Sequence, residues 1–136
     1  MLSVNDAHAM GEGYYQAILA MSRAQVGVIA KRIALESATE RRKRKETEVA
    51  KAVLDMFEAR GVRTNEQQRE AEIRATLQAD TAWVALVQEV DSARTLQQEM
   101  ALEAEVAREH CQRIRATMYL LAAVIGGVKV SPDPVS

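Results

Sequence analysis

The apolar positions in the second half of the chain follow a heptad-like pattern. Apolar or small residues recur there at steps of three or four, at Leu86, Val90, Ala93, Leu96, Met100, Ala104, Ala107, Cys111, Ile114, Met118, Leu121 and Ile125. A seam of this length is typical of a long helix that packs along a partner helix. We therefore predict one long C-terminal helix that ends at Gly126-Gly127.

A second apolar stripe predicts a helix from about residue 30 to residue 60. It consists of Leu35, Ala38, Val49, Val53 and Met56, and Arg42 interrupts it. Gly61 stands where a glycine commonly ends a helix.

Before this stripe, the sequence is less favourable to a helix. Gly11, Gly13 and Gly27 each weaken a helix by roughly 1 kcal/mol relative to Ala. We therefore predict a separate and more mobile helix over residues 5–30.

The segment between the two stripes carries signals for a short helix. Thr64 and Gln67 have the spacing of a capping box, with Thr64 at the N-cap. The short helix is expected from Asn65 to about Leu77. Asp80 either caps the next helix or lies within a continuing one.

Together these patterns predict an all-α fold, in which a long antiparallel helical hairpin contains a short connecting helix. We expect one helical domain over residues 1–127 and a flexible tail over 128–136. Met118 to Ile125 is apolar on nearly every face, and one partner helix covers only one face. This surplus predicts a homo-oligomer that assembles through the C-terminal helix.

Charge is segregated along a chain whose net charge is −1. Residues 31–63 hold ten Lys and Arg against six Asp and Glu, whereas residues 64–113 hold five against ten. The basic half contains five consecutive basic residues, Arg41, Arg42, Lys43, Arg44 and Lys45. A segregated basic half is compatible with a polyanionic partner.

The basic run leaves two interpretations open. On a helix, Arg41, Arg44, Lys45 and Lys51 fall within about a third of the circumference. They either bind a polyanion or form a solvated flank that pairs with Glu40, Glu48 or the acidic last helix.

Candidate chemistry is sparse, and we expect neither an enzyme nor a cofactor. Glu109, His110 and Cys111 are adjacent, so on a helix they point about 100° apart and do not converge on a metal. Cys111 lies on the apolar seam and is expected to be a core residue. The absence of a signal peptide, the single cysteine and the shortness of the apolar stretches predict a cytoplasmic protein without a membrane partner.

One stretch resembles a known family. Residues 48–61, EVAKAVLDMFEARG, resemble the motif of phage recombination mediators of the UvsY type, in which a basic helix runs through a Lys-Ala-x-Leu-Asp-aromatic pattern into an Arg-Gly turn. Thr76 to Asp80 and the long helix that follows resemble the second half of that family. Its members are small helical oligomers that bind single-stranded DNA and help to load a recombinase onto strands coated with single-strand-binding protein.

The resemblance implies roles for particular residues. Lys51 matches the DNA-contacting lysine of the family and Arg41 matches a basic position upstream, whereas Val53 stands where the family has a second basic residue. Ile114, Met118, Leu121 and Ile125 fall where the family oligomerises.

These observations predict a phage-type recombination accessory protein in the cytoplasm of a bacterial host cell. Its partners would be single-stranded DNA, a recombinase, single-strand-binding protein and further copies of itself. The predicted DNA-binding residues are Arg41, Arg42, Lys43, Arg44, Lys45 and Lys51. The alternative is a structural or adaptor oligomer, such as a phage assembly or scaffold component, without DNA binding.

Overall fold

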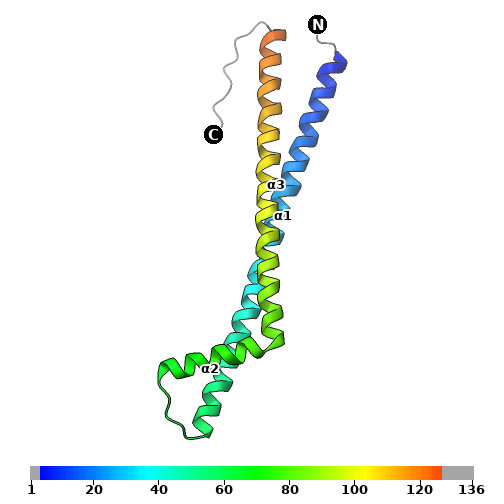
Figure 1. The fold of residues 1–136 in the computed structure, drawn as a ribbon. Helices are drawn as coiled ribbons and strands as arrows, with labels where there is room; N and C mark the ends of the chain where they lie inside the picture. The colour runs from blue at the N-terminus through cyan, green and yellow to red at the C-terminus, as the bar shows by residue number, and fades with distance from the viewer. Residues whose placement is uncertain (1–3, 127–136) are drawn as a thin grey trace. The chain divides into compact units, whose positions relative to one another are not determined.

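The computed structural model describes residues 4–126, and over this range the chain forms three α-helices and no strand (Figure 1). Helix α1 spans Val4–Ala59, α2 spans Glu66–Ala79 and α3 spans Thr81–Gly126. The predicted all-α class is confirmed. The predicted flexible tail, residues 128–136, lies outside the described residues.

α1 is one continuous helix, where the sequence predicted a separate helix over residues 5–30. It passes without a break through Gly11, Gly13 and Gly27. The low helix propensity of glycine is a local preference, and packing along a partner helix routinely overrides it.

Gly61 ends α1 as predicted. It adopts a positive φ of 63°, the left-handed conformation that glycine enters without a Cβ penalty. The backbone N–H of Gly61 donates to the carbonyl of Glu58, and that of Val62 donates to the carbonyl of Phe57. This pair of hydrogen bonds is a Schellman motif, which satisfies carbonyls that the helix end would leave unpaired.

The capping box of α2 lies one residue later than predicted. Asn65, not Thr64, is the N-cap, and Gln68, not Gln67, is its partner. The backbone N–H of Gln68 donates to Oδ1 of Asn65 over 2.8 Å, and the N–H of Asn65 donates to Oε1 of Gln68 over 3.1 Å. Asn is a better N-cap residue than Thr, and the required three-residue spacing is also available from Asn65.

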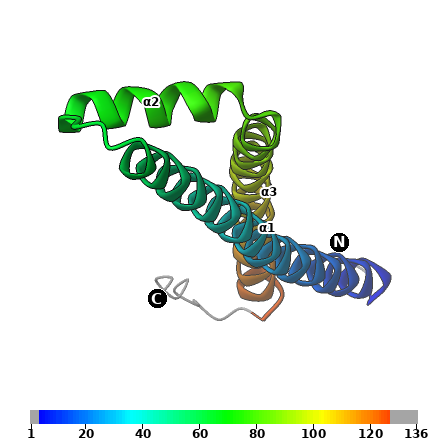
Figure 2. The same cartoon turned by 90° about the horizontal axis from the view of Figure 1, so that it is seen from below.

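Asp80 lies between α2 and α3, and its side chain caps the N-terminus of α3. Its Oδ1 accepts the backbone N–H groups of Ala82 over 2.9 Å and of Trp83 over 3.1 Å. Asp80 is therefore the N-cap of α3, which was one of the two predicted possibilities. In both views α2 lies across the direction of α3 instead of continuing it (Figures 1 and 2).

Contacts between helices divide the chain into two compact units. Among the described residues, the first unit, here called the terminal unit, combines the part of α1 up to Ile29 with the part of α3 from Gln98 onward, and the second, the central unit, is Ala30–Gln97. Each contains a segment of α1 and a segment of α3. The predicted single domain over residues 1–127 stays a prediction.

In the terminal unit, Gly27 of α1 packs against the side chain of Met100 of α3. A Cβ atom added to Gly27 would lie 2.8 Å from Sδ of Met100, closer than real Cβ atoms approach a neighbour. Ala17 of α1 and Cys111 of α3 are buried in the same unit. The buried positions of this unit thus hold small residues, and a long side chain of α3 covers the glycine of α1.

In the central unit, the buried side chains are Ala38, Val49 and Val53 of α1 and Val90 of α3. The apolar stripe predicted for α1 is confirmed at these three positions. Leu35 and Met56, the other two members of the stripe, are half-buried.

The core of the described residues is small. None of the buried side chains in either unit is larger than valine. Many large apolar side chains are exposed instead: Val4, Tyr15, Val26, Ile29, Ile33, Leu54, Val62, Val84, Leu96, Leu102, Val106, Leu120, Val124 and Ile125. The helices therefore carry more apolar surface than one chain covers.

The contact between Gly27 and the Met100 side chain predicts unequal effects of two glycine substitutions. Gly13→Ala meets nothing within 4 Å, so it should gain up to about 1 kcal/mol of stability from helix propensity. Gly27→Ala should gain less or lose stability, because Met100 must move. Urea unfolding of both variants measures the difference, and an equal gain at the two positions would contradict the packing described.

Candidate nucleic-acid interface

The predicted DNA-binding residues lie on the segment of α1 that belongs to the central unit, and two of them pair with acidic residues far along the chain. The guanidinium of Arg41 forms two hydrogen bonds with the carboxylate of Glu89 in α3, one of them from Nη1 to Oε2 over 3.2 Å. Nζ of Lys45 lies 3.3 Å from Oδ2 of Asp80. These two cations face acidic partners of their own chain.

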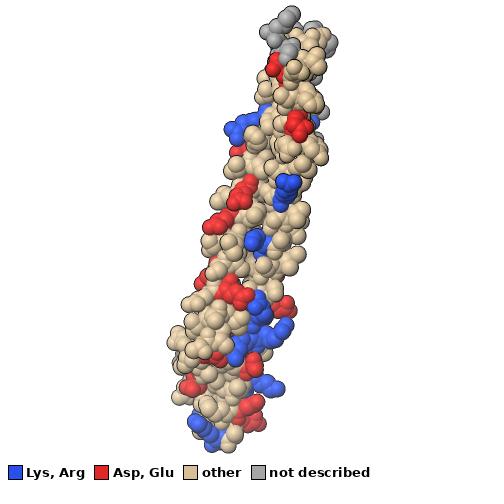
Figure 3. Space-filling model, turned by 90° about the vertical axis from the view of Figure 1, so that its right-hand side faces the viewer, with Lys and Arg blue, Asp and Glu red and all other residues tan. Residues whose placement is uncertain are grey.

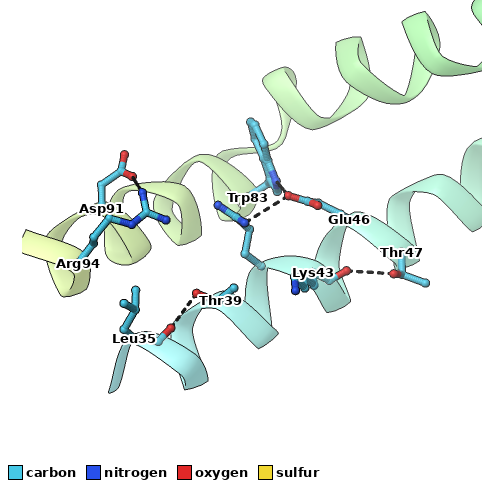
Figure 4. Close-up of polar contacts among 9 residues, drawn as sticks. Leu35, Thr39, Lys43, Glu46, Thr47, Trp83, Asp91 and Arg94 are labelled. Carbon is cyan, nitrogen blue, oxygen red and sulfur yellow. Dashed lines mark hydrogen bonds and ion pairs between the residues drawn. The ribbon is translucent and has the colours of Figure 1, made fainter. Parts of the chain in front are cut away.

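Arg42 is half-buried and pairs within α1. Its Nε lies 3.4 Å from Oε1 of Glu46, close enough for an ion pair but without hydrogen-bond geometry. The same oxygen accepts the indole N–H of Trp83 over 3.3 Å, so a side chain of α3 joins the pair (Figure 4). Arg42 interrupts the apolar stripe of α1, and Glu46 supplies the counter-charge that a cation there requires.

Lys43, Arg44 and Lys51 are exposed, and in the described part of the chain they make no ion pair. Acidic side chains share the exposed side of α1 with Arg44 and Lys51, namely Glu40, Glu48, Asp55 and Glu58. On the face drawn in Figure 3, several basic side chains gather in the lower half of the view, and acidic side chains border them. Mixed signs weaken the local attraction for a polyanion.

Asp80 is the acidic residue that the arrangement affects most. The pKa of the Asp80 carboxyl lies below its ordinary value of 3.8. The hydrogen bond from the backbone N–H of Trp83 lowers it most, and burial opposes this effect. The side chain of Lys45 and the N–H of Ala82 lower the pKa further. The carboxylate is thus held in its charged form, in which it both caps α3 and pairs with Lys45.

The geometry divides the basic run into two sets. Arg41, Arg42 and Lys45 hold segments of the central unit together, and Lys43, Arg44 and Lys51 remain available to a partner. The predicted flank pairing is present, but its partners are Glu46, Asp80 and Glu89. Glu40 and Glu48, which were expected to pair, make no ion pair within residues 4–126.

The four residues predicted at the oligomer interface do not share one environment. Ile114, Met118 and Leu121 are half-buried, and Ile125 is exposed. An open apolar hollow of about 170 Å³ in the terminal unit is lined by Ala7, Met10, Met118, Leu121, Ala122 and Ile125. This side of α3 therefore faces α1 of its own chain, and the large apolar residues of the same segment that are exposed are Leu120, Val124 and Ile125.

Sequence reasoning expected pairing with the acidic last helix, where Glu89 lies, but it missed Glu46 and Asp80 as partners and the exposed apolar residues Leu120 and Val124 of α3. Asp80 was visible as a cap, but its pairing with Lys45 depends on where the connecting helix places it. A signal existed for Leu120 and Val124, since both lie off the predicted seam within a segment that is apolar on nearly every face.

Other candidate chemistry is limited. Cys111 is a free, buried cysteine on the seam, as predicted. Within residues 4–126, no cluster of three or more His, Cys, Asp or Glu side chains is arranged to hold a metal ion. None of the three described helices contains a stretch apolar enough to cross a membrane.

The lowered pKa of Asp80 predicts a pH-dependent contribution to stability. A carboxyl with a lowered folded-state pKa stabilises the fold above its unfolded pKa, and this contribution is lost as the pH falls through the folded pKa. Asp80→Ala should destabilise the protein at pH 7 more than Asp80→Asn does, because Asn still caps a helix.

Unfolding of the wild type and of both variants between pH 7 and pH 2 provides the test. The difference in stability between the wild type and Asp80→Asn should shrink below pH 4, since the pair with Lys45 requires the carboxylate. A difference that stays constant with pH would contradict the proposed role of that pair.

No protein-family model, no curated protein and no solved structure matches this chain. The resemblance to recombination mediators of the UvsY type therefore stays a prediction.

Proposed function

We propose that this chain is a non-enzymatic structural or adaptor protein that acts by self-association. The observation that supports this proposal is the imbalance of apolar surface among the described residues: the six buried side chains are no larger than valine, while eight apolar side chains larger than valine and six further valines are exposed. Exposed apolar area on this scale marks an interaction surface. Further copies of the same chain are the simplest partner that covers it.

In this proposal α1 and α3 form a long antiparallel hairpin with α2 as its connecting helix. Support comes from each unit taken by itself. In the central unit, Arg41 meets Glu89 and Lys45 meets Asp80, so the contacts run in opposite order along the two helices. In the terminal unit, Gly27 meets Met100 and Met10 lines a hollow with Met118, which is again the opposite order.

The pairing of the basic run supports a structural role. Three of its five residues are engaged with Glu46, Asp80 and Glu89. A polyanion would have to compete with these carboxylates for the cations. The pairs are partly exposed and individually weak, so breaking one pair costs the polyanion little free energy. The carboxylates nevertheless neutralise part of the positive charge that would attract a polyanion to this segment.

A second candidate function is sequence-independent binding of single-stranded DNA, as a recombination mediator that also contacts a recombinase and single-strand-binding protein. The observation that favours it is the exposure of Lys43, Arg44 and Lys51 without ion pairs among the described residues. Lys51 is also the residue that matches the DNA-contacting lysine of the resembling family. Assembly into an oligomer would multiply these three cations.

Self-association predicts a species larger than the monomer. Sedimentation at micromolar concentration should show it, and it should persist at about 0.5 M salt, because apolar contacts are not screened by ions. A protein that sediments as a monomer at high concentration would contradict the proposal.

A titration with single-stranded DNA at about 50 mM salt separates the two candidates. The structural role predicts no measurable binding. The mediator role predicts binding that weakens with salt, and the slope of log affinity against log salt should fall by about 0.7 for each phosphate that a variant no longer neutralises. In that case the triple variant Lys43→Ala, Arg44→Ala and Lys51→Ala should flatten the slope and retain helicity, since Ala is a good helix former.

The matched control for this titration is the triple variant Arg23→Ala, Arg60→Ala and Arg63→Ala, which removes three exposed cations elsewhere on the chain. Equal weakening of binding in both triple variants would show that the basic run has no special role.

A further inference from the structure

An exposed face of α3 in the terminal unit carries a stripe of its own, one edge of which, at Arg113 and Thr117, borders a hollow shared with Met10 and Gly13 of α1. Its apolar members are Leu102, Val106, Leu120 and Val124, whose exposed fractions are 65%, 62%, 67% and 77%. Glu109, Arg113 and Thr117 lie between them and are also exposed. At 100° per residue, all seven positions fall within about 80° of the helix circumference. The stripe extends over about 33 Å of helix.

The stripe is symmetric about Arg113. Val106 and Leu120 each lie seven residues from it, and Leu102 and Val124 each lie eleven residues from it. Glu109 and Thr117 lie four residues away on either side. If a two-fold axis at the level of Arg113 and perpendicular to α3 relates two copies of the helix, each apolar position of the stripe lies at the level of an apolar position of the other copy.

We infer that this stripe is an isologous interface at which α3 of a second copy packs antiparallel, with Arg113 at the two-fold axis. The inference rests on the proposed self-association and specifies its surface. Across the axis, Leu102 faces Val124 of the second copy and Val106 faces Leu120 of the second copy. Each apolar residue is thereby covered by another, as an isologous contact requires.

The charges of the stripe favour this antiparallel pairing. At the axis, the side chain of Arg113 lies one helical turn, about 6 Å along the axis, from Glu109 of the second copy. The long Arg side chain spans that distance, so two symmetric Arg113–Glu109 ion pairs flank the axis. Neither residue makes an ion pair within the described part of its own chain, so both are available.

A parallel arrangement fits the same stripe less well. Both arrangements place Arg113 beside Arg113 of the second copy, with Glu109 one turn away. The parallel one also places Glu109 beside Glu109 in one layer, whereas the antiparallel one separates the two carboxylates to opposite sides of the axis, and like charges in one layer repel. The order of charges along α3 therefore favours the antiparallel second copy.

Charge reversal with mixing tests the inference in the full chain. In Glu109→Arg homodimers, both symmetric pairs consist of two cations and repel. In Arg113→Glu homodimers, both pairs consist of two carboxylates and also repel. Each variant alone should associate about tenfold more weakly than the wild type or worse. In an equimolar mixture, the heterodimer regains both attractive pairs, and its dissociation constant should return to within about threefold of the wild-type value.

The matched control is the pair Asp91→Arg with Arg94→Glu. It reverses an exposed ion pair of 3.7 Å on α3 outside the stripe (Figure 4), and it should leave association unchanged. Circular dichroism verifies that the variants keep their helicity. Sedimentation equilibrium supplies the dissociation constants.

Cysteine cross-linking reports the orientation without relying on charge variants. In a Cys111→Ala background, Val106→Cys mixed with Leu120→Cys should form a disulfide between the two chains, and neither variant should cross-link to itself. Self-cross-linking of each variant would indicate a parallel pair and overturn the inference.

The outcomes distinguish the inference from the proposed function. A wild-type protein that self-associates, with a mixture no tighter than its separate components, would overturn the antiparallel interface and leave self-association standing. A wild type that stays monomeric would overturn both.

Discussion

In both units the structure depends on packing between α1 and α3 at positions that hold small side chains. The buried positions hold residues no larger than valine, and at Gly27 the end of the Met100 side chain fills the space that a Cβ atom would take. Small side chains bury little apolar area per residue. Eight apolar side chains larger than valine remain exposed to solvent in a single chain.

In the central unit, ion pairs join α1 to α3 beside a core that consists of small apolar side chains. The pairs of Arg41 with Glu89 and of Lys45 with Asp80 tie the basic segment of α1 to the beginning of α3. Such partly exposed pairs contribute about 0–1 kcal/mol each. Their effect is mainly to favour one register of the two segments, because a shift along α1 would bring cations beside the wrong residues.

Periodicity predicted much of the fold and less of the candidate site. The stripe through Ala38, Val49 and Val53 and the glycine at residue 61 were readable because they follow from helix geometry and local backbone conformation. The continuity of α1 was not readable, since local propensity argued against it and packing overrode it. Glu46 lies at i+4 spacing from Arg42 on the same helix, so this partner was within reach of the sequence pattern. Asp80 and the particular residue of the last helix, Glu89, were not readable, because they depend on the register between segments that lie about 40 residues apart in sequence.

The central claim is that one chain buries too little apolar surface and gains stability from association. The thermal midpoint measured as a function of protein concentration tests this claim most directly, since association of folded chains raises the midpoint by mass action. The account predicts a midpoint that rises steadily between about 1 and 100 μM protein, a range over which mass action on the folded oligomer is measurable. A midpoint independent of concentration, in a protein that remains monomeric throughout, would contradict it.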